Sequence, residues 1–138
     1  MKRILILILI AAITSVSLAQ EKRVAMVIGN ANYINGAPLA NPINDAEDIK
    51  SQLINAGFKV FHYENLDQVS MKKSIDDFGK QLSNADVGLF FYAGHGLQAK
   101  GLNYLVPVDA NLKTENDVEY NCVDAGRILA KMEDAGTK

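Results

Sequence analysis

The sequence predicts an α/β fold, a three-layer α/β/α sandwich built on a mainly parallel sheet. Short apolar runs rich in β-branched and aromatic residues alternate along the chain with amphipathic stretches of helical spacing. The run 87–92 is apolar on both strand faces, as in the centre of a parallel sheet. A strand–helix–strand–helix–strand order with right-handed crossovers places helices on both faces of such a sheet.

The first half of the chain supplies two of the strands and one helix. Apolar runs predict strands at 24–28 and 58–63. Between them, residues 29–44 are dense in Asn, Gly and Pro, which is typical of a loop. Asn44 or Asp45 then caps a helix that ends at Gly57.

The next stretch predicts a second helix and the third strand. Asp67 or Ser70 opens the helix, and the strand follows at 87–92. Apolar side chains at helical spacing give the helix one buried face: Met71, Ile75, Phe78 and Leu82.

The remaining residues predict smaller elements. Residues 97–108 form a hairpin that turns at Lys100–Gly101, and residues 109–119 form a polar loop. Asp124 caps a last short helix, which stops at Gly136. In this architecture such a helix normally leads into another strand, so the domain is expected to be truncated before that strand.

The N-terminus is typical of a secretory signal peptide. A basic start, Met1–Arg3, precedes an unbroken apolar run at 4–13, and Ser17–Ala19 offers small residues at a cleavage site. Cleavage before Gln20 is expected, with export to the periplasm or the extracellular space. The alternative of a retained membrane anchor is disfavoured because the uncharged run is short, so no stable membrane span is expected after cleavage.

Composition excludes several function classes. Residues 20–138, long enough for one domain, carry 12 basic and 16 acidic residues, a formal net charge of −4. No basic run with interleaved aromatics occurs, which argues against a nucleic-acid partner. Cys122 is the sole cysteine, so no internal disulfide is expected. No metal-binding spacing is present, so neither a metal nor a cofactor is predicted.

His95 is the strongest candidate for a functional side chain. It follows the third predicted strand and is flanked by Gly94 and Gly96. Ligands of open α/β sheets bind at the carboxyl ends of strands, and glycines let another chain approach closely. The alternative is a histidine that merely caps the strand. His62 shares a strand face with apolar residues, so packing or a local hydrogen bond is expected there.

The residues that surround this histidine resemble a known family. The run Phe-Phe-Tyr-Ala-Gly-His-Gly at 90–96 is similar to the histidine motif of caspase-like peptidases, especially the metacaspase-related bacterial members. Three further motifs support the resemblance in order and spacing: Val-Ile-Gly-Asn-Ala-Asn-Tyr at 27–33, Asn-Pro-Ile-Asn-Asp-Ala at 41–46 and Asn-Tyr-Leu-Val-Pro-Val-Asp-Ala at 103–110. The resemblance covers nearly all of 22–138.

The resemblance implies peptide hydrolysis by a cysteine–histidine dyad. His95 would be the general acid/base, and the backbone N–H of Gly96 would stabilise the oxyanion. In caspases the nucleophilic cysteine lies about 50 residues after the histidine, beyond Lys138, so the nucleophile is expected to be missing from this chain. Cys122 lacks the family's sequence context and is expected to be a small buried side chain.

Asp45 is the second site residue that the resemblance implies. In metacaspase-like members an Asn-Asp pair at the start of the first helix contributes an acidic wall to the pocket for the residue before the cut, and Asn44–Asp45 matches that pair. An acid there would favour Arg or Lys substrates. Helix capping by Asp45 is an equally weighted and compatible role.

Two main functions remain open. The first is an exported cysteine endopeptidase that acts on protein or peptide substrates, and this chain alone would be inactive. The second is a non-catalytic caspase-fold module for binding or adaptor duty. A Rossmann-like nucleotide binder is a weaker third option, because the glycine fingerprint is absent. Some relatives use calcium, and the sequence fixes neither calcium dependence nor the oligomeric state.

Overall fold

A computed structural model describes residues 20–138, so the expected signal peptide at 1–19 lies outside the described residues. In chain order the elements are β1 (Arg23–Gly29), α1 (Pro42–Asn55), β2 (Phe58–Glu64), α2 (Gln68–Leu82), β3 (Val87–Ala93), β4 (Gly96–Ala99), β5 (Leu102–Leu105), α3 (Asn116–Asn121), β6 (Val123–Asp124) and α4 (Gly126–Asp134). Among residues 20–138, no helix combines the length and the apolar character needed to cross a membrane.

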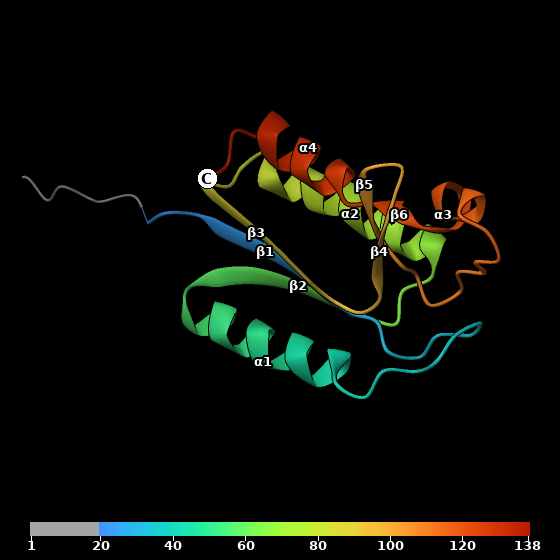
Figure 1. The fold of residues 1–138 in the computed structure, drawn as a ribbon. Coiled ribbons are helices and arrows are strands. Elements are labelled where there is room, and N and C mark those ends of the chain that lie inside the picture. The colour runs from blue at the N-terminus through green and yellow to red at the C-terminus, as the bar shows by residue number, and fades with distance from the viewer. Residues whose placement is uncertain (1–19) are drawn as a thin grey trace, which may run out of the picture.

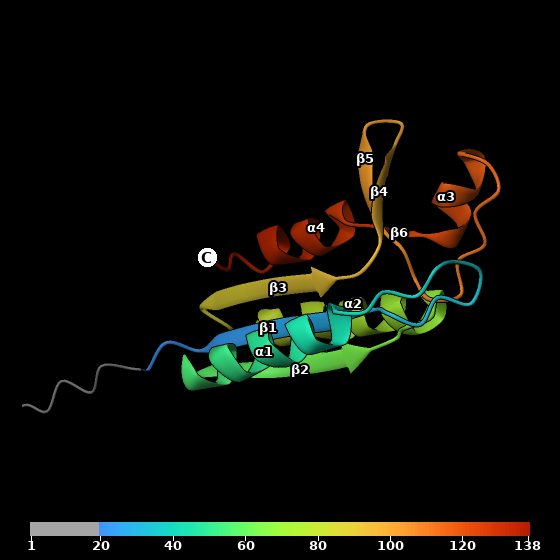
Figure 2. The same cartoon turned by 60° about the horizontal axis from the view of Figure 1, so that its bottom comes forward.

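The main sheet is parallel and has the order β2-β1-β3. Its central strand, β1, is buried along almost its whole length. Helix α1 lies on one face of the sheet, while α2 and α4 lie together on the other (Figures 1 and 2). The three-layer α/β/α arrangement with a parallel sheet is therefore confirmed.

The larger core cluster lies between the sheet and α2. Alternate β1 residues, among them Met26 and Ile28, face this helix and are fully buried. The predicted apolar face of α2 is buried against them: Met71, Ile75, Phe78 and Leu82. Each such side chain stabilises the fold by about 1.5–3 kcal/mol when it leaves water.

The opposite face of β1 approaches α1 closely. A side chain on Gly29 would place its Cβ 2.7 Å from the Pro42 carbonyl oxygen and 3.0 Å from the Ala46 Cβ. Only glycine fits here, because real Cβ atoms essentially never come that near to backbone. The first turn of α1 is thereby held against the carboxyl end of β1.

The predicted hairpin is present and belongs to a second, antiparallel sheet of order β4-β5-β6. Lys100 and Gly101 form its turn with φ values of 50° and 80°, the left-handed conformation that two-residue hairpin turns favour. Figure 2 shows the hairpin projecting beyond the main sheet. A second core cluster lies beneath it and includes Tyr33, Tyr104 and Val106.

Three local predictions need correction. Helix α1 starts earlier than predicted: Asn41 holds the N-cap position and Pro42 the first turn, so neither Asn44 nor Asp45 is the cap. Proline is favourable there because its φ is already helical and no N–H is required. The expected loop at 109–119 contains the start of α3. Asp124 lies in β6, and the N-cap of α4 is Ala125.

The last described residue extends the main sheet. The Lys138 N–H donates to the Asp86 carbonyl at 3.2 Å, and the Gly88 N–H donates to the Lys138 carbonyl at 3.2 Å. One residue that bonds to two positions flanking Val87 is the pattern of a parallel ladder. Lys138 therefore pairs with the side of β3 that faces away from β1.

Candidate active site

His95 lies just past the carboxyl end of β3, where β3 passes into the hairpin, and its side chain is exposed. Its Nε2 lies 3.3 Å from the Ala37 carbonyl oxygen. A carbonyl only accepts hydrogen bonds, so this contact assigns the proton of the neutral ring to Nε2. Nδ1 is then the nitrogen with a lone pair available for a proton.

Two tyrosine hydroxyls hold the backbone of His95. The His95 N–H donates to the Tyr33 hydroxyl at 2.7 Å, and that hydroxyl lies 3.3 Å from the Tyr92 hydroxyl. Tyr92 donates its one proton to the carbonyls of His95 and Val106, at 3.0 and 2.9 Å. Because that proton is engaged, the Tyr33 hydroxyl donates to Tyr92. Both backbone polar groups of His95 are thus fixed.

The same pair of hydroxyls explains the glycine before the histidine. A Cβ on Gly94 would lie 2.5 Å from the Tyr92 hydroxyl and 2.7 Å from the Tyr33 hydroxyl. Burial, together with the Tyr33 hydroxyl, raises the pKa of Tyr92 far above its usual range. Tyr92 therefore remains a neutral donor. The Tyr33 ring also contacts the imidazole, with ring centroids 4.5 Å apart.

The backbone N–H of Gly96 points away from the hairpin partner. Gly96 is opposite Leu105, and the adjacent pair is bonded by the Val106 N–H to the His95 carbonyl at 3.0 Å. Hydrogen-bonded and non-bonded pairs alternate along an antiparallel ladder, so Gly96 occupies a non-bonded position. An oxyanion could therefore accept a hydrogen bond from this N–H.

A buried asparagine forms hydrogen bonds to two other loops at the carboxyl edge of the main sheet. Asn30 is fully buried. Its Nδ2 lies 3.3 Å from the carbonyls of Leu66 and Val106, and its Oδ1 accepts from the Leu66 N–H at 2.9 Å. Sequence reasoning assigned no role to Asn30, Tyr33 or Tyr92. One signal could have found two of them, because Asn30 and Tyr33 belong to the same motif of the family resemblance.

Asp45 lies in the first turn of α1 and is exposed. It is the only charged residue that lines a cavity of about 470 Å³, which Gly94 and the last residues of β3 also line. Asp45 makes no side-chain hydrogen bond or ion pair within residues 20–138. The structure therefore brings Asp45 and the histidine loop to one edge of the sheet.

A second cavity of about 260 Å³ lies at the same edge and is lined by His95 and Gly96 themselves. Aliphatic and aromatic side chains form much of its wall: Tyr33, Leu97, Val106 and Leu112. The cavity with Asp45 is lined by Gly94, and this one by His95. Adjacent residues of the histidine loop therefore line an acidic cavity and an apolar one.

Cys122 lies outside both cavities. Its side chain is 2% exposed and packs in the cluster beneath the hairpin. Burial raises the pKa of its thiol to about 11, which disfavours the nucleophilic thiolate at neutral pH. The expectation of a small buried side chain agrees with this environment.

His62 lies on the α1 face of β2 between two carboxylates. Its Nδ1 is 3.5 Å from Glu47, and its Nε2, which is buried and without a hydrogen bond, is 3.7 Å from Glu64. Within residues 20–138, these three side chains are close enough together to offer ligands to one divalent cation. Lys50 already pairs with Glu47 at 3.2 Å. The His62 side chain is 13% exposed, as expected for a packed residue, and two carboxylates lie beside it.

Comparisons with known proteins agree on a single family. The caspase domain family matches residues 22–136. The chain belongs to this family. Mucosa-associated lymphoid tissue lymphoma translocation protein 1 from Homo sapiens is 34% identical over 90% of the chain, and its Mus musculus homolog is 33% identical over 90%.

The chain spans only 15% of the human protein and 14% of the mouse protein. A solved structure, the Drosophila initiator caspase Dronc, superposes with a TM-score of 0.63 at 15% identity, over 80% of this chain and 42% of that one. At that identity the likeness establishes the caspase fold alone. The sequence-based assignment to caspase-like proteins is confirmed.

Proposed function

We propose that this caspase domain belongs to a cysteine endopeptidase in which His95 is the general acid/base. The observation that carries the proposal is the exposure of the His95 side chain together with the contact of its Nε2. This side chain is exposed at the carboxyl end of β3, and its Nε2 contacts the Ala37 carbonyl, which leaves Nδ1 to exchange protons. A fixed backbone beneath an exposed imidazole is what proton transfer in a defined geometry requires.

The chemistry proceeds in two steps. The cysteine thiol gives its proton to His95 Nδ1, and the resulting thiolate attacks the scissile carbonyl while the Gly96 N–H donates to the oxyanion. The C–N bond breaks as His95 Nδ1 gives its proton to the leaving amine, and a thioester remains. Water then attacks the thioester, His95 takes a proton from that water, and the acid product and the thiolate are released.

The nucleophile would come from a strand next to β3. Support comes from Lys138, whose backbone already pairs in parallel fashion with β3. A strand continuing from there runs in the same direction as β3 and ends at the same edge as His95. Cys122 is a poor candidate, because its thiol is buried and its pKa is raised to about 11.

Asp45 supports cleavage after Arg or Lys. It is exposed, and no cation within residues 20–138 pairs with it, so it can bind a substrate cation. A carboxylate attracts a guanidinium or ammonium group and repels an acidic side chain. The residue before the cut would therefore occupy the cavity lined by Asp45.

A non-catalytic binding module is the second candidate. The observation that favours it is the burial of Cys122, the sole thiol of the chain. Such a module would bind peptides at the same edge without cleaving them.

Fluorogenic Arg, Lys and Asp peptides distinguish the two. A chain that continues past Lys138 through an exposed cysteine should cut the Arg and Lys peptides, and the 138-residue chain should cut none. Turnover by the short chain that disappears on Cys122→Ser would overturn the choice of nucleophile. An extended chain that binds peptides but never cuts them would support the binding module.

Export is a separate proposal that rests on the basic and apolar N-terminal residues. Mass spectrometry of the protein from its native host should find Gln20 at the mature N-terminus. An intact Met1 would contradict cleavage.

A further inference from the structure

The two cavities at the carboxyl edge differ in chemistry. The first is lined by Asp45, and the second is lined by no Asp, Glu, Lys or Arg. The wall of the second includes the Tyr33 ring and the aliphatic side chains of Leu97 and Leu112. Leu112 is 37% exposed, so part of its side chain is open to a ligand. An apolar ligand group would gain affinity by covering this surface.

The wall of the apolar cavity is built in advance. The Ile34 N–H donates to the Val108 carbonyl at 2.8 Å, and Asn35 Nδ2 donates to the carbonyls of Asp109 and Ala110 at 3.2 and 3.3 Å. These bonds join the loop after β1 to the loop after β5. Both loops line the cavity, so its wall is held together by bonds within the protein.

The direction of a bound peptide follows from the proton that His95 transfers. His95 protonates the leaving amine, which belongs to the residue after the cut bond. That residue therefore lies at the imidazole, and the imidazole lines the apolar cavity. The residue before the cut lies on the other side of the histidine loop, in the cavity of Asp45.

We infer that the cavity of about 260 Å³ beside His95 binds an apolar side chain, that of the residue that follows the cleaved bond. This inference rests on the proposed function. The preferred substrate is then a peptide with Arg or Lys before the cut and an aliphatic residue such as Leu after it. Acidic residues are excluded from the position before the cut by Asp45, and charged residues are disfavoured after it by the cost of desolvation.

Binding to the 138-residue chain tests this without catalysis. Blocked dipeptides acetyl-Arg-Leu-amide, acetyl-Arg-Gly-amide and acetyl-Arg-Glu-amide are titrated into labelled protein, and NMR follows His95, Asp45 and the Leu112 methyl groups. The Leu peptide should bind about tenfold more tightly than the Gly peptide, because it buries part of an aliphatic side chain. Only the Leu peptide should shift the Leu112 methyl resonances strongly.

Variants sharpen the test. Leu112→Asp should remove the tenfold preference, and Leu112→Ala should reduce it. Leu129→Asp is the matched control, since Leu129 is an exposed leucine on α4 and should keep the preference. The amide spectrum reports whether each variant is folded. If Leu112→Asp does not fold, Leu112→Ala still tests the preference.

The outcomes separate the inference from the proposed function. Equal affinity for the Leu and Gly peptides, with shifts at Asp45 and His95, would overturn the inference and leave the proposed function standing. An undiminished Leu preference in Leu112→Asp would also overturn it. Arg peptides that shift neither Asp45 nor His95 would overturn both.

Discussion

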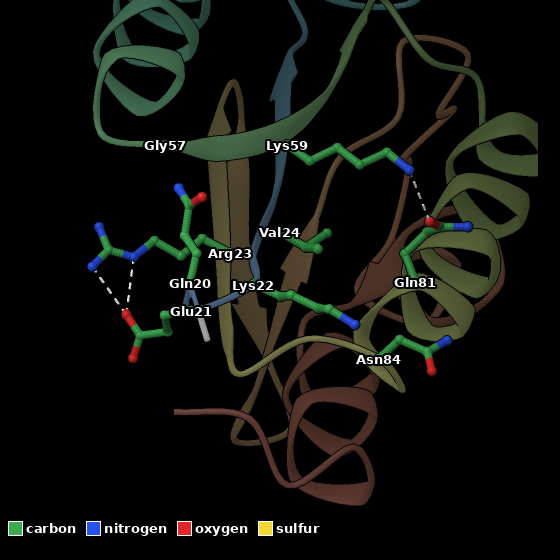
Figure 3. A pocket seen from close by; sticks show the side chains of 9 residues that line it. All are labelled: Gln20, Glu21, Lys22, Arg23, Val24, Gly57, Lys59, Gln81 and Asn84. Atoms are coloured by element: carbon green, nitrogen blue, oxygen red, sulfur yellow. Dashed lines mark hydrogen bonds and ion pairs between the residues drawn. The ribbon is translucent and has the colours of Figure 1, made fainter. Parts of the chain in front are cut away.

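The two ends of the main sheet contain cavities of similar size but different character. At the amino end, a cavity of about 380 Å³ is lined by residues of the β1 start and their neighbours (Figure 3). There Arg23 pairs with Glu21 at 2.9 Å, and the Lys59 ammonium donates to Gln81 at 3.2 Å. At the carboxyl end, Asp45 and the Nδ1 of His95 have no such partner within residues 20–138.

The difference shows that a hollow is not sufficient evidence of a site. At the amino end, the Arg23 guanidinium pairs with Glu21 and the Lys59 ammonium donates to the Gln81 side chain, so two of the cationic groups there are already engaged. At the carboxyl end, the backbone is fixed by Tyr33, Tyr92 and Asn30, while the side chains above it remain available. A functional site needs that combination, because reactive groups must be both positioned and free to bind.

The largest effect is expected for His95→Ala in an extended, active chain. Loss of the general acid/base should lower kcat by about 100-fold or more. His62→Ala is the matched control, since His62 lies on the α1 face of β2 between Glu47 and Glu64. Steady-state kinetics on an Arg peptide measures both. Equal losses in the two variants would remove His95 from the reaction.

Asp45→Asn should raise KM for Arg substrates by about tenfold, because a charge-assisted contact becomes a neutral one. Asp45 is not the N-cap of α1, so the melting temperature should stay nearly constant. Asp48→Asn, on the exposed side of the same helix, should leave KM unchanged. Unaltered Arg kinetics in Asp45→Asn would show that the acidic cavity is not a subsite.

Tyr33→Phe should act through position rather than through contact with substrate. The variant keeps the ring against the imidazole but removes the acceptor of the His95 N–H. We expect kcat to fall about fivefold at constant KM, and stability to fall by about 1 kcal/mol. Tyr120→Phe, at an exposed tyrosine, is the control. A change confined to stability would make the role of Tyr33 purely structural.

The smallest effect is expected at the amino end. Lys59→Gln removes an exposed contact with Gln81 and should change the free energy of unfolding by less than about 0.5 kcal/mol. Urea denaturation measures this change. Phe78→Ala is the positive control: Phe78 is buried in the core, and its loss should lower the free energy of unfolding by about 3–5 kcal/mol. A loss of activity in Lys59→Gln would contradict the contrast between the two ends.

Sequence reasoning was most successful where the signal is local. The apolar period of α2 and the turn at Lys100–Gly101 each depend on residues a few positions apart, and each is confirmed. Of the two predicted starts of α2, Asp67 and Ser70, the structure selects Asp67 as the cap. Pro42 misled the prediction of α1, because proline both breaks and begins helices. The position of His95 after β3 was likewise readable from the apolar run and its glycines.

The supporting contacts of the site were not readable from the sequence. The hydrogen bond from His95 to Tyr33 joins residues 62 positions apart, and that from Asn30 to Val106 joins residues 76 apart. No local pattern encodes such pairs. The approach of Glu47 to His62 was not readable for the same reason, since Glu47 belongs to α1 and His62 to β2.

The pairing of Lys138 with β3 has a consequence for solubility. It covers the outer side of β3 at Asp86 and Gly88, and along 89–93 that side has no strand partner within residues 20–138. Those residues are apolar and partly exposed. An uncovered apolar strand edge attracts the same edge of a second molecule. Whatever chain segment lies along 89–93 therefore decides whether the domain stays dispersed at high concentration, in addition to any part it takes in the chemistry.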